Sequence, residues 1–177
     1  MSVVVANLSG FDDYFALFRI KPQFKIDRQA LESAYLTVQK QVHPDLHATG
    51  SDAEKRVSMQ MATLANSAYR TLMNPIQRGL YLCSKNGVDP QLETNTAMPA
   101  SFLMQQMEWR ETLDDVRNDV AGLEQLYAEV EKTRQAVLKE VEQAIDGEQD
   151  FELAAQKLRA LLFIDKFGVE LEEAISA

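Results

Sequence analysis

The sequence predicts an all-α protein built from two helical domains. Alanine, leucine, glutamate and glutamine are abundant among its 177 residues, whereas there are only 7 glycines and 5 prolines, a composition that favours helix. Apolar residues recur at helical spacing along most of the chain, and we find no convincing strand pattern and no internal repeat. Residues 86–98 hold Gly87, Pro90 and a polar cluster, so they predict a linker between residues 11–85 and residues 99–177.

Residues 11–42 predict two helices. In the first, four aromatic residues recur at i, i+3, i+4 and i+7, the spacing of one helical face: Phe11, Tyr14, Phe15 and Phe18. Asp27 is a candidate N-cap for the second helix, and Ile26 and Leu31 have the spacing of a hydrophobic staple. This helix should run to about residue 42, with an apolar stripe formed by Leu31, Tyr35, Val38 and Val42.

Residues 51–85 predict two further helices. The segment "SDAE" has the capping-box pattern, with Ser51 as the N-cap and Glu54 at N3. The inner stripe expected for the helix that follows is Val57, Met61, Leu64, Ala68 and Leu72. We expect this helix to form an antiparallel hairpin with the preceding one, with residues 43–50 as the turn. Pro75 then begins a short helix, because proline is well tolerated at the first helical position.

The second domain should be a small antiparallel bundle of three helices. Its first helix begins near Pro99 and ends around residue 118, and its second spans roughly residues 121–146. The segment "DGEQD" interrupts the pattern, and a final helix runs from about residue 151 to residue 175. The second helix carries apolar residues at heptad-like spacing: Val120, Leu123, Tyr127, Val130, Val137 and Val141.

The net charge of −9 is divided unevenly along the chain. Residues 11–85 contain 10 lysines and arginines against 7 aspartates and glutamates, a charge of +3. Residues 86–177 contain 8 against 20, a charge of −12. The two halves should therefore meet different partners. No basic patch is large enough to follow a phosphate backbone, which argues against a nucleic-acid partner.

Nothing in the sequence predicts export or membrane insertion. No apolar run approaches the roughly 18 residues of a membrane span, and the start, "MSVVVANLSG", lacks the basic residues of a signal or transit peptide. We therefore expect a cytoplasmic protein with no membrane partner. The single cysteine, Cys83, cannot form an internal disulfide, and its apolar surroundings predict a small buried side chain in a reducing compartment.

The tip of the predicted hairpin carries the tripeptide His43-Pro44-Asp45. Pro44 breaks the helix and pushes His43 out of the helical conformation, so His43 and Asp45 should be displayed on a stiff, solvent-facing turn. One interpretation is a loop that merely needed a helix breaker. Two others are a metal site formed by His43, Asp45 and His47, and a His–Asp general base. The sequence offers no further histidine, nucleophile elbow or phosphate-binding glycine loop to support either.

Several motifs together resemble a known family. A helix, the tripeptide and a capped antiparallel helix containing "LANSAYRTL" resemble a J-domain, and "DYFALF" and "NPIQRGLYLCSKNGV" fit the same pattern. In the second half, "SFLMQQMEWRETLDD" and "LRALLFIDKF" resemble the C-terminal domain of the HscB family of iron–sulfur cluster co-chaperones. The resemblance covers roughly residues 12–175.

This resemblance implies a mechanism without catalytic activity, metal or cofactor of the chain's own. The J-domain would dock on a DnaK-class ATPase of the HscA type and stimulate ATP hydrolysis, while the C-terminal bundle would hold a scaffold protein of the IscU type. The positions implied in chaperone docking are His43, Pro44, Asp45, Arg28 and Lys40. The basic face is thin, because Glu32 lies nearby and Leu46 stands where a basic residue is common.

The helix predicted after Pro99 has two apolar faces. On a wheel of about 100° per residue, a core face within about 40° of Phe102 contains Trp109, Leu113, Val116 and Val120. The far side combines apolar residues with acids: Leu103, Met104, Met107, Glu108, Glu111 and Asp115. Exposed apolar groups rimmed by charge, with adaptable methionines among them, indicate a partner site. Alternatively, other helices of the bundle or the first domain cover this face.

The resemblance assigns scaffold contacts to the same far side. The family's contacting positions correspond to Leu103, Met104, Met107, Glu108, Glu111, Asp115 and Phe163. Asp115 shortens the more usual glutamate, and Met107 replaces an aliphatic residue. The alternative is a general J-domain co-chaperone with a different client or a dimerising C-terminal bundle. A metal-dependent enzyme that uses His43 and His47 would instead contain bound metal by elemental analysis.

We predict that His43→Gln abolishes stimulation of the chaperone ATPase while the protein stays folded. A change on an exposed turn usually alters the free energy of unfolding by no more than about 0.5 kcal/mol, so the helix content and the thermal midpoint should be nearly unchanged. Circular dichroism and single-turnover ATPase assays measure the two effects separately. A folded variant that still stimulates fully would remove His43 from the docking site.

Overall fold

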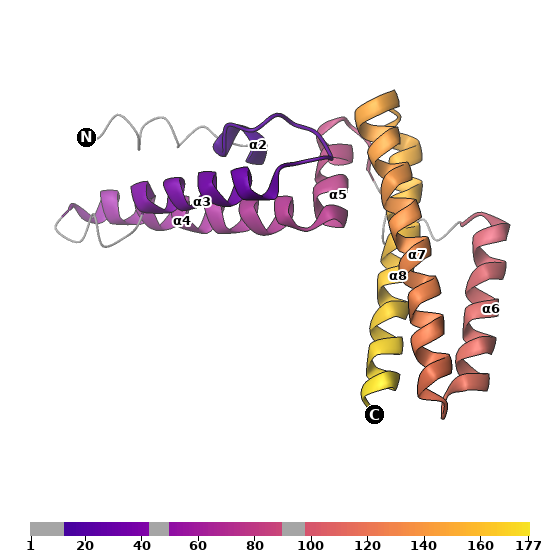
Figure 1. Cartoon of the computed structure of the whole chain (residues 1–177). Helices are drawn as coiled ribbons and strands as arrows, with labels where there is room; N and C mark the ends of the chain where they lie inside the picture. The colour runs from indigo at the N-terminus through magenta and orange to yellow at the C-terminus, as the bar shows by residue number, and fades with distance from the viewer. Residues whose placement is uncertain (1–12, 43–49, 90–97) are drawn as a thin grey trace. The chain divides into compact units, whose positions relative to one another are not determined.

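The computed structural model describes residues 13–42, 50–89 and 98–177, and these ranges are helical with no strand (Figure 1). The predicted all-α class is therefore confirmed. The helices are α2 (Tyr14–Leu17), α3 (Arg28–Val42), α4 (Asp52–Met73), α5 (Pro75–Lys85), α6 (Ala100–Val116), α7 (Val120–Glu142), the π-helical turn η2 (Gln143–Glu148) and α8 (Phe151–Ser176). None of the helices in these ranges is long and apolar enough to cross a membrane.

The chain forms two compact units that divide inside α5, between Arg78 and Gly79. The first turn of α5 thus belongs with α2, α3 and α4, and the remainder belongs with α6, α7 and α8. Most of the predicted linker, residues 90–97, lies outside the described residues. The domain bounds expected from the sequence, residues 11–85 and 99–177, stay a prediction.

Local capping signals begin the two long helices of the first unit. The carboxylate of Asp27 accepts hydrogen bonds from the amides of Gln29 and Ala30 at 2.9 and 3.1 Å, so it caps α3 as predicted. The Ser51 hydroxyl accepts from the Glu54 amide while the Glu54 carboxylate accepts from the Ser51 amide, which is the predicted capping box. These contacts satisfy amides that have no partner inside the helix.

Helices α3 and α4 lie side by side as an antiparallel pair (Figure 1), and a cluster around Tyr35 joins them. The Tyr35 ring stacks on Tyr69 with a centroid separation of 4.1 Å and meets the edge of Phe18 at 6.4 Å. Its hydroxyl donates to the Asn66 side-chain oxygen at 2.8 Å, and the Gln39 amide donates to that same oxygen at 2.6 Å. Stacking and hydrogen bonds therefore fix the register of the two helices.

The buried face of α4 is turned relative to the prediction. Val57 and Leu64 are only partly buried, and the buried positions are Ser58, Met61, Ala65, Ala68 and Leu72. The two alanines and the serine are small, so α3 can lie close to α4 along this face. The expected stripe was wrong at Val57 and Leu64. The prediction favoured bulky apolar residues, whereas the close approach of α3 to α4 requires small residues on the buried face.

A buried arginine stabilises the connection between α2 and α3. Arg78 is 7% exposed, and its Nε donates to the carbonyl of Phe24 at 2.7 Å. Its Nη1 donates to the carbonyl of Leu72 at 2.5 Å, and the guanidinium lies 5.0 Å from the centroid of the Phe24 ring. A connection without regular structure is thus held against the end of α4 by charge-assisted hydrogen bonds.

The second unit is organised around the antiparallel pair α7 and α8, with α6 beside them (Figure 1). The buried residues of α7 are Leu123, Leu126, Val130 and Val141. Three residues of the predicted stripe depart from it, since Val120 is 58% exposed and Tyr127 and Val137 are only half-buried. Tyr127 instead donates its hydroxyl to Glu172 of α8 at 2.8 Å.

The predicted interruption near residue 148 takes the form of a widened helical turn. The winding loosens to the π-helical segment η2 after Glu142, and Gln149 then ends the helix in the left-handed conformation with φ of 56°. The Asp150 carboxylate accepts from the Leu153 amide at 2.9 Å and begins α8. The segment "DGEQD" therefore ends one helix and starts the next, as expected.

The end of α5 packs on the start of α8 through small side chains. A methyl group added at Gly79 would lie 2.7 Å from Cδ2 of Leu158, which is fully buried. Cys83 is also fully buried, and its Sγ lies 3.6 Å from the carbonyl oxygen of Phe151. Burial, with a contribution from Glu152, raises the pKa of the Cys83 thiol to about 11. The predicted buried cysteine is confirmed.

We predict that Gly79→Ala destabilises the second unit. Overpacking against Leu158 should cost about 1–3 kcal/mol, which exceeds the gain of about 0.5–1 kcal/mol from replacing a helical glycine by alanine. Gly168→Ala in α8 is the matched control, because nothing lies within 4 Å of the added methyl group. Urea unfolding followed by circular dichroism should show a lower midpoint for the first variant and an unchanged or higher one for the second. Equal stabilisation of both would show that Leu158 moves freely.

Candidate functional site

The first predicted surface comprises α3 and the tripeptide that follows it. His43, Pro44 and Asp45 lie outside the described residues, as do Leu46 and His47. Arg28 and Lys40 are exposed on α3, where the sequence placed them. With Glu32 and Leu36 they form a row at i, i+4 spacing, and Leu36 is 51% exposed. The two basic side chains are thus separated by an acid and an apolar residue.

Ser58 supports the end of α3 directly before the tripeptide. Its side chain is buried, and its hydroxyl donates to the carbonyl of Val42, the last residue of α3, at 2.6 Å. A carbonyl in the last turn of a helix has no partner within the helix, so Ser58 supplies one from α4. Sequence reasoning missed this residue. The signal was available, because Ser58 lies three and seven residues before Met61 and Ala65 on the buried face of α4.

The second predicted surface lies on α6, which Trp109 attaches to the rest of the bundle. The indole Nε1 of Trp109 donates to Glu129 of α7 at 3.0 Å, and the ring stacks on Phe167 of α8 at 5.7 Å with an interplanar angle of 9°. Beside it, the Arg110 guanidinium lies 5.7 Å from the Phe167 ring centroid and 3.5 Å from Glu170. One turn of α6 thus contacts both neighbouring helices.

The predicted core face of α6 is confirmed in its centre and wrong at its far end. Trp109 and Leu113 are each 2% exposed, and Phe102 and Val116 are half-buried. Val120 does not continue this face. Because α6 ends at Val116 and the chain turns before α7, Val120 is the first residue of the next helix.

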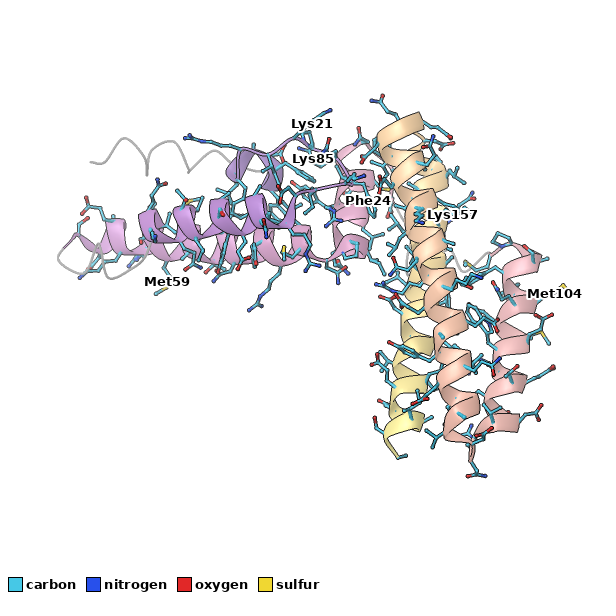
Figure 2. The ribbon with its side chains drawn as sticks, in the orientation of Figure 1. Lys21, Phe24, Met59, Lys85, Met104 and Lys157 are labelled. Carbon is cyan, nitrogen blue, oxygen red and sulfur yellow. The ribbon has the colours of Figure 1, made fainter. Side chains whose placement is uncertain are left out.

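The opposite side of α6 carries an exposed apolar cluster. Leu103, Met104 and Met107 are 46%, 62% and 63% exposed, and Phe163 on α8 is 43% exposed. Figure 2 shows the Met104 side chain extending from α6 at an open edge of the bundle. No other helix in the described residues of the second unit covers this cluster, so the alternative in which bundle helices bury it is wrong.

Phe163 belongs to the same surface as the α6 residues. The short turn between α6 and α7 and the antiparallel pairing of α7 with α8 make α6 and α8 parallel (Figure 1). Their register is fixed where Arg110 contacts Phe167. Leu103 lies two turns before Arg110 on the same side of α6, and Phe163 lies one turn before Phe167 on the same side of α8. The side chains of Leu103 and Phe163 therefore face the same side of the bundle.

An acidic strip borders the cluster. Glu108, Glu111 and Asp115 are exposed on α6, and no lysine or arginine of the described ranges forms an ion pair with them. The neighbouring Asp114, in contrast, forms an ion pair with Arg117 at 2.9 Å. The strip therefore presents unneutralised negative charge beside an apolar surface, an arrangement that favours a basic partner.

In the described ranges, no three histidine, cysteine, aspartate or glutamate side chains lie together in a way that could hold a metal ion. The metal interpretation concerned His43, Asp45 and His47, which fall outside those ranges. The same is true of the His–Asp general base. Neither interpretation gains support from the residues around the exposed cluster.

Comparisons with known proteins show which family the chain belongs to. Residues 98–172 match the family model described as the HSCB C-terminal oligomerisation domain. A co-chaperone HscB homologue of Bordetella avium is 51% identical over 160 residues, covering 90% of this chain and 95% of that protein. The chain belongs to the HscB family of co-chaperones. A second relative, from Ralstonia nicotianae, is 45% identical over 169 residues, 94% of this chain and 96% of its own length.

Solved HscB structures share the fold. HscB from Vibrio cholerae matches with a TM-score of 0.80 and 32% identity, covering 91% of this chain and 96% of its own. Human HscB matches with a TM-score of 0.85 and 30% identity, covering 93% of this chain and 82% of its own. The family that the sequence motifs indicated is thereby confirmed.

We predict that Trp109→Ala lowers the free energy of unfolding by about 3–5 kcal/mol, the usual cost of truncating a buried aromatic residue. Met104→Ala on the same helix is the matched control and should change it by no more than about 0.5 kcal/mol, because the side chain is largely exposed. Urea unfolding followed by circular dichroism compares the two variants. Similar midpoints would mean that other contacts hold α6 in place.

Proposed function

We propose that this HscB-family protein is an adaptor in the maturation of iron–sulfur proteins. Its second unit binds an IscU-type scaffold protein, and its first unit docks on a DnaK-class chaperone of the HscA type and stimulates that chaperone's ATPase. The protein delivers one partner to the other and carries out no reaction itself. The observation that supports scaffold binding most directly is the exposed apolar cluster of Leu103, Met104, Met107 and Phe163 beside an unpaired acidic strip.

A free bundle has a physical reason to bury these apolar side chains. Large apolar side chains exposed together lose the stabilisation of about 25 cal/mol per Å² that burial provides. A partner that covers them recovers it. Methionine adapts to a partner's shape, and Glu108, Glu111 and Asp115 would orient basic groups at the edge of the interface. A scaffold surface with an apolar centre and a basic rim fits this description.

The chaperone-docking half of the proposal is supported by the hairpin of α3 and α4 and by the tripeptide in the sequence. His43, Pro44 and Asp45 follow an α3 whose final carbonyl is held by Ser58. Arg28 and Lys40 supply exposed positive charge on that helix. We propose that these five residues contact the chaperone.

Self-association of the C-terminal bundle is the second candidate, because the matched family model is described as an oligomerisation domain. Charge argues against self-association through the α6 surface. Two copies that met there would bring together two acidic strips whose carboxylates have no ion-pair partner among the described residues, and like charges across an interface cost affinity. Sedimentation of the purified protein over a range of concentrations separates a monomer from an oligomer.

We predict that replacing Leu103, Met104 and Phe163 together by alanine strongly weakens scaffold binding while the ATPase stimulation measured without scaffold survives. Interface anchors commonly cost 1 kcal/mol or more each, so affinity should fall by about 3 kcal/mol, or roughly a hundredfold. Val169→Ala is the matched control, because Val169 is also exposed on α8, at 53%, and lies outside the cluster. Calorimetric titration with the IscU-type scaffold measures both variants.

The two halves of the proposal have separate readouts. ATPase rates of the chaperone with and without scaffold should lose only the scaffold-dependent increment in the triple variant. Unchanged scaffold affinity in a triple variant that circular dichroism shows to be folded would remove the α6 surface from the proposal. Loss of stimulation without scaffold would show that the substitutions disturb the first unit as well.

A further inference from the structure

The first half of α6 stands off the bundle. Its buried residues are Trp109 and Leu113, which both lie in the second half of the helix. Between Pro99 and Glu108 no residue is buried, and Phe102 is only half-buried. A bundle helix normally buries a residue at every turn of its inner face. Two turns of α6 therefore lack the close contact with α7 and α8 that Trp109 provides further along.

The gap between this part of α6 and the other two helices forms an open groove. Its volume is about 650 Å³, and it is bounded by α6 on one side and by α7 and α8 on the other. Phe102 and Met104 contribute from α6, Ala136 and Val137 from α7, and Ala160 from α8, so apolar groups line much of it. Its volume falls in the range of about 300–1,000 Å³ typical of ligand pockets, which is room for a large apolar side chain.

The groove is continuous with the proposed scaffold surface. Met104 and Glu108 line the groove and also belong to the exposed cluster and the acidic strip. A partner that covers the outer side of α6 therefore reaches the mouth of the groove without a gap. Aromatic and aliphatic anchors that enter pockets carry a large share of the energy of protein interfaces.

The charges at the groove define what should enter it. The Lys157 ammonium also lines the groove, but it is paired with the Glu140 carboxylate at 2.5 Å. In the described part of the chain, no cation pairs with Glu108. Half of the residues that line the groove are apolar and half are polar or charged. The apolar residues lie beside one unneutralised carboxylate, that of Glu108, which matches an apolar side chain followed or preceded by a lysine or arginine.

We propose that the scaffold protein inserts a large apolar side chain, next to a basic residue, into the groove between α6, α7 and α8. This inference rests on the proposed function, and it extends the scaffold site from the outer surface of α6 onto α7 and α8. Ala136 and Val137 become scaffold contacts, and Glu108 receives the basic neighbour. Dispersion contacts that the open groove lacks in the free protein are made when it is filled.

Two substitutions at Ala136 test the groove directly. Ala136 is exposed in the free protein and lines the groove, so Ala136→Trp should fill it and Ala136→Glu should make it polar without disturbing the core. Ala128→Trp and Ala128→Glu are matched controls, because Ala128 is exposed on the same helix, about 12 Å away along its axis. Calorimetric titration of each full-length variant with the IscU-type scaffold gives the affinity, after circular dichroism shows native helix content.

Both Ala136 variants should bind the scaffold about tenfold more weakly, the loss expected for one anchor, and both Ala128 variants should bind as the unmodified protein does. If the Ala136 variants bind normally while the triple variant at Leu103, Met104 and Phe163 does not, the groove stays empty in the complex and only this inference fails. If neither set changes affinity, the scaffold binds elsewhere and the proposed function fails too. An equal loss of scaffold affinity in the Ala128 and Ala136 variants would also overturn the inference that the scaffold occupies the groove.

Discussion

The attachment of α6 by Trp109 is the contact on which the proposed scaffold surface depends. This side chain stacks on Phe167, donates to Glu129 and is almost fully buried, so it joins one turn of α6 to both α7 and α8. Few other α6 residues are buried. The helix can therefore leave its remaining apolar residues exposed, because one large aromatic residue supplies much of the packing that keeps it in place.

That arrangement separates stability from recognition along a single helix. Leu103, Met104 and Met107 contribute little to the core, since each is more than two-fifths exposed. They remain free to meet a partner, as does the groove beneath the first turns of α6. A tightly packed first half of α6 would stabilise the bundle and would remove both features. Binding surfaces commonly retain such a deficit of packing, at some cost in stability.

In the first unit, small and polar residues hold α3 in place against α4. Ala65 and Ala68 let α3 approach α4, and the Tyr35 cluster then fixes their register. Ser58 holds the last carbonyl of α3, directly before the tripeptide. The segment that the proposal assigns to chaperone docking is therefore preceded by a firmly held helix end, which restricts where the chain can leave α3.

The sequence by itself determined the features that depend on neighbouring residues. Asp27 caps an amide two residues on, and Ser51 and Glu54 cap each other over one turn, so local spacing was enough to predict them. The helices, the exposed side of α6 and the family also followed from spacing and motifs. Tertiary structure alone decided the contacts of Arg78 with Phe24, Ser58 with Val42 and Gly79 with Leu158, which join residues 54, 16 and 79 positions apart. Such pairs, and the groove beside α6, arise because packing selects size and hydrogen-bonding capacity across helices, which helical periodicity does not encode.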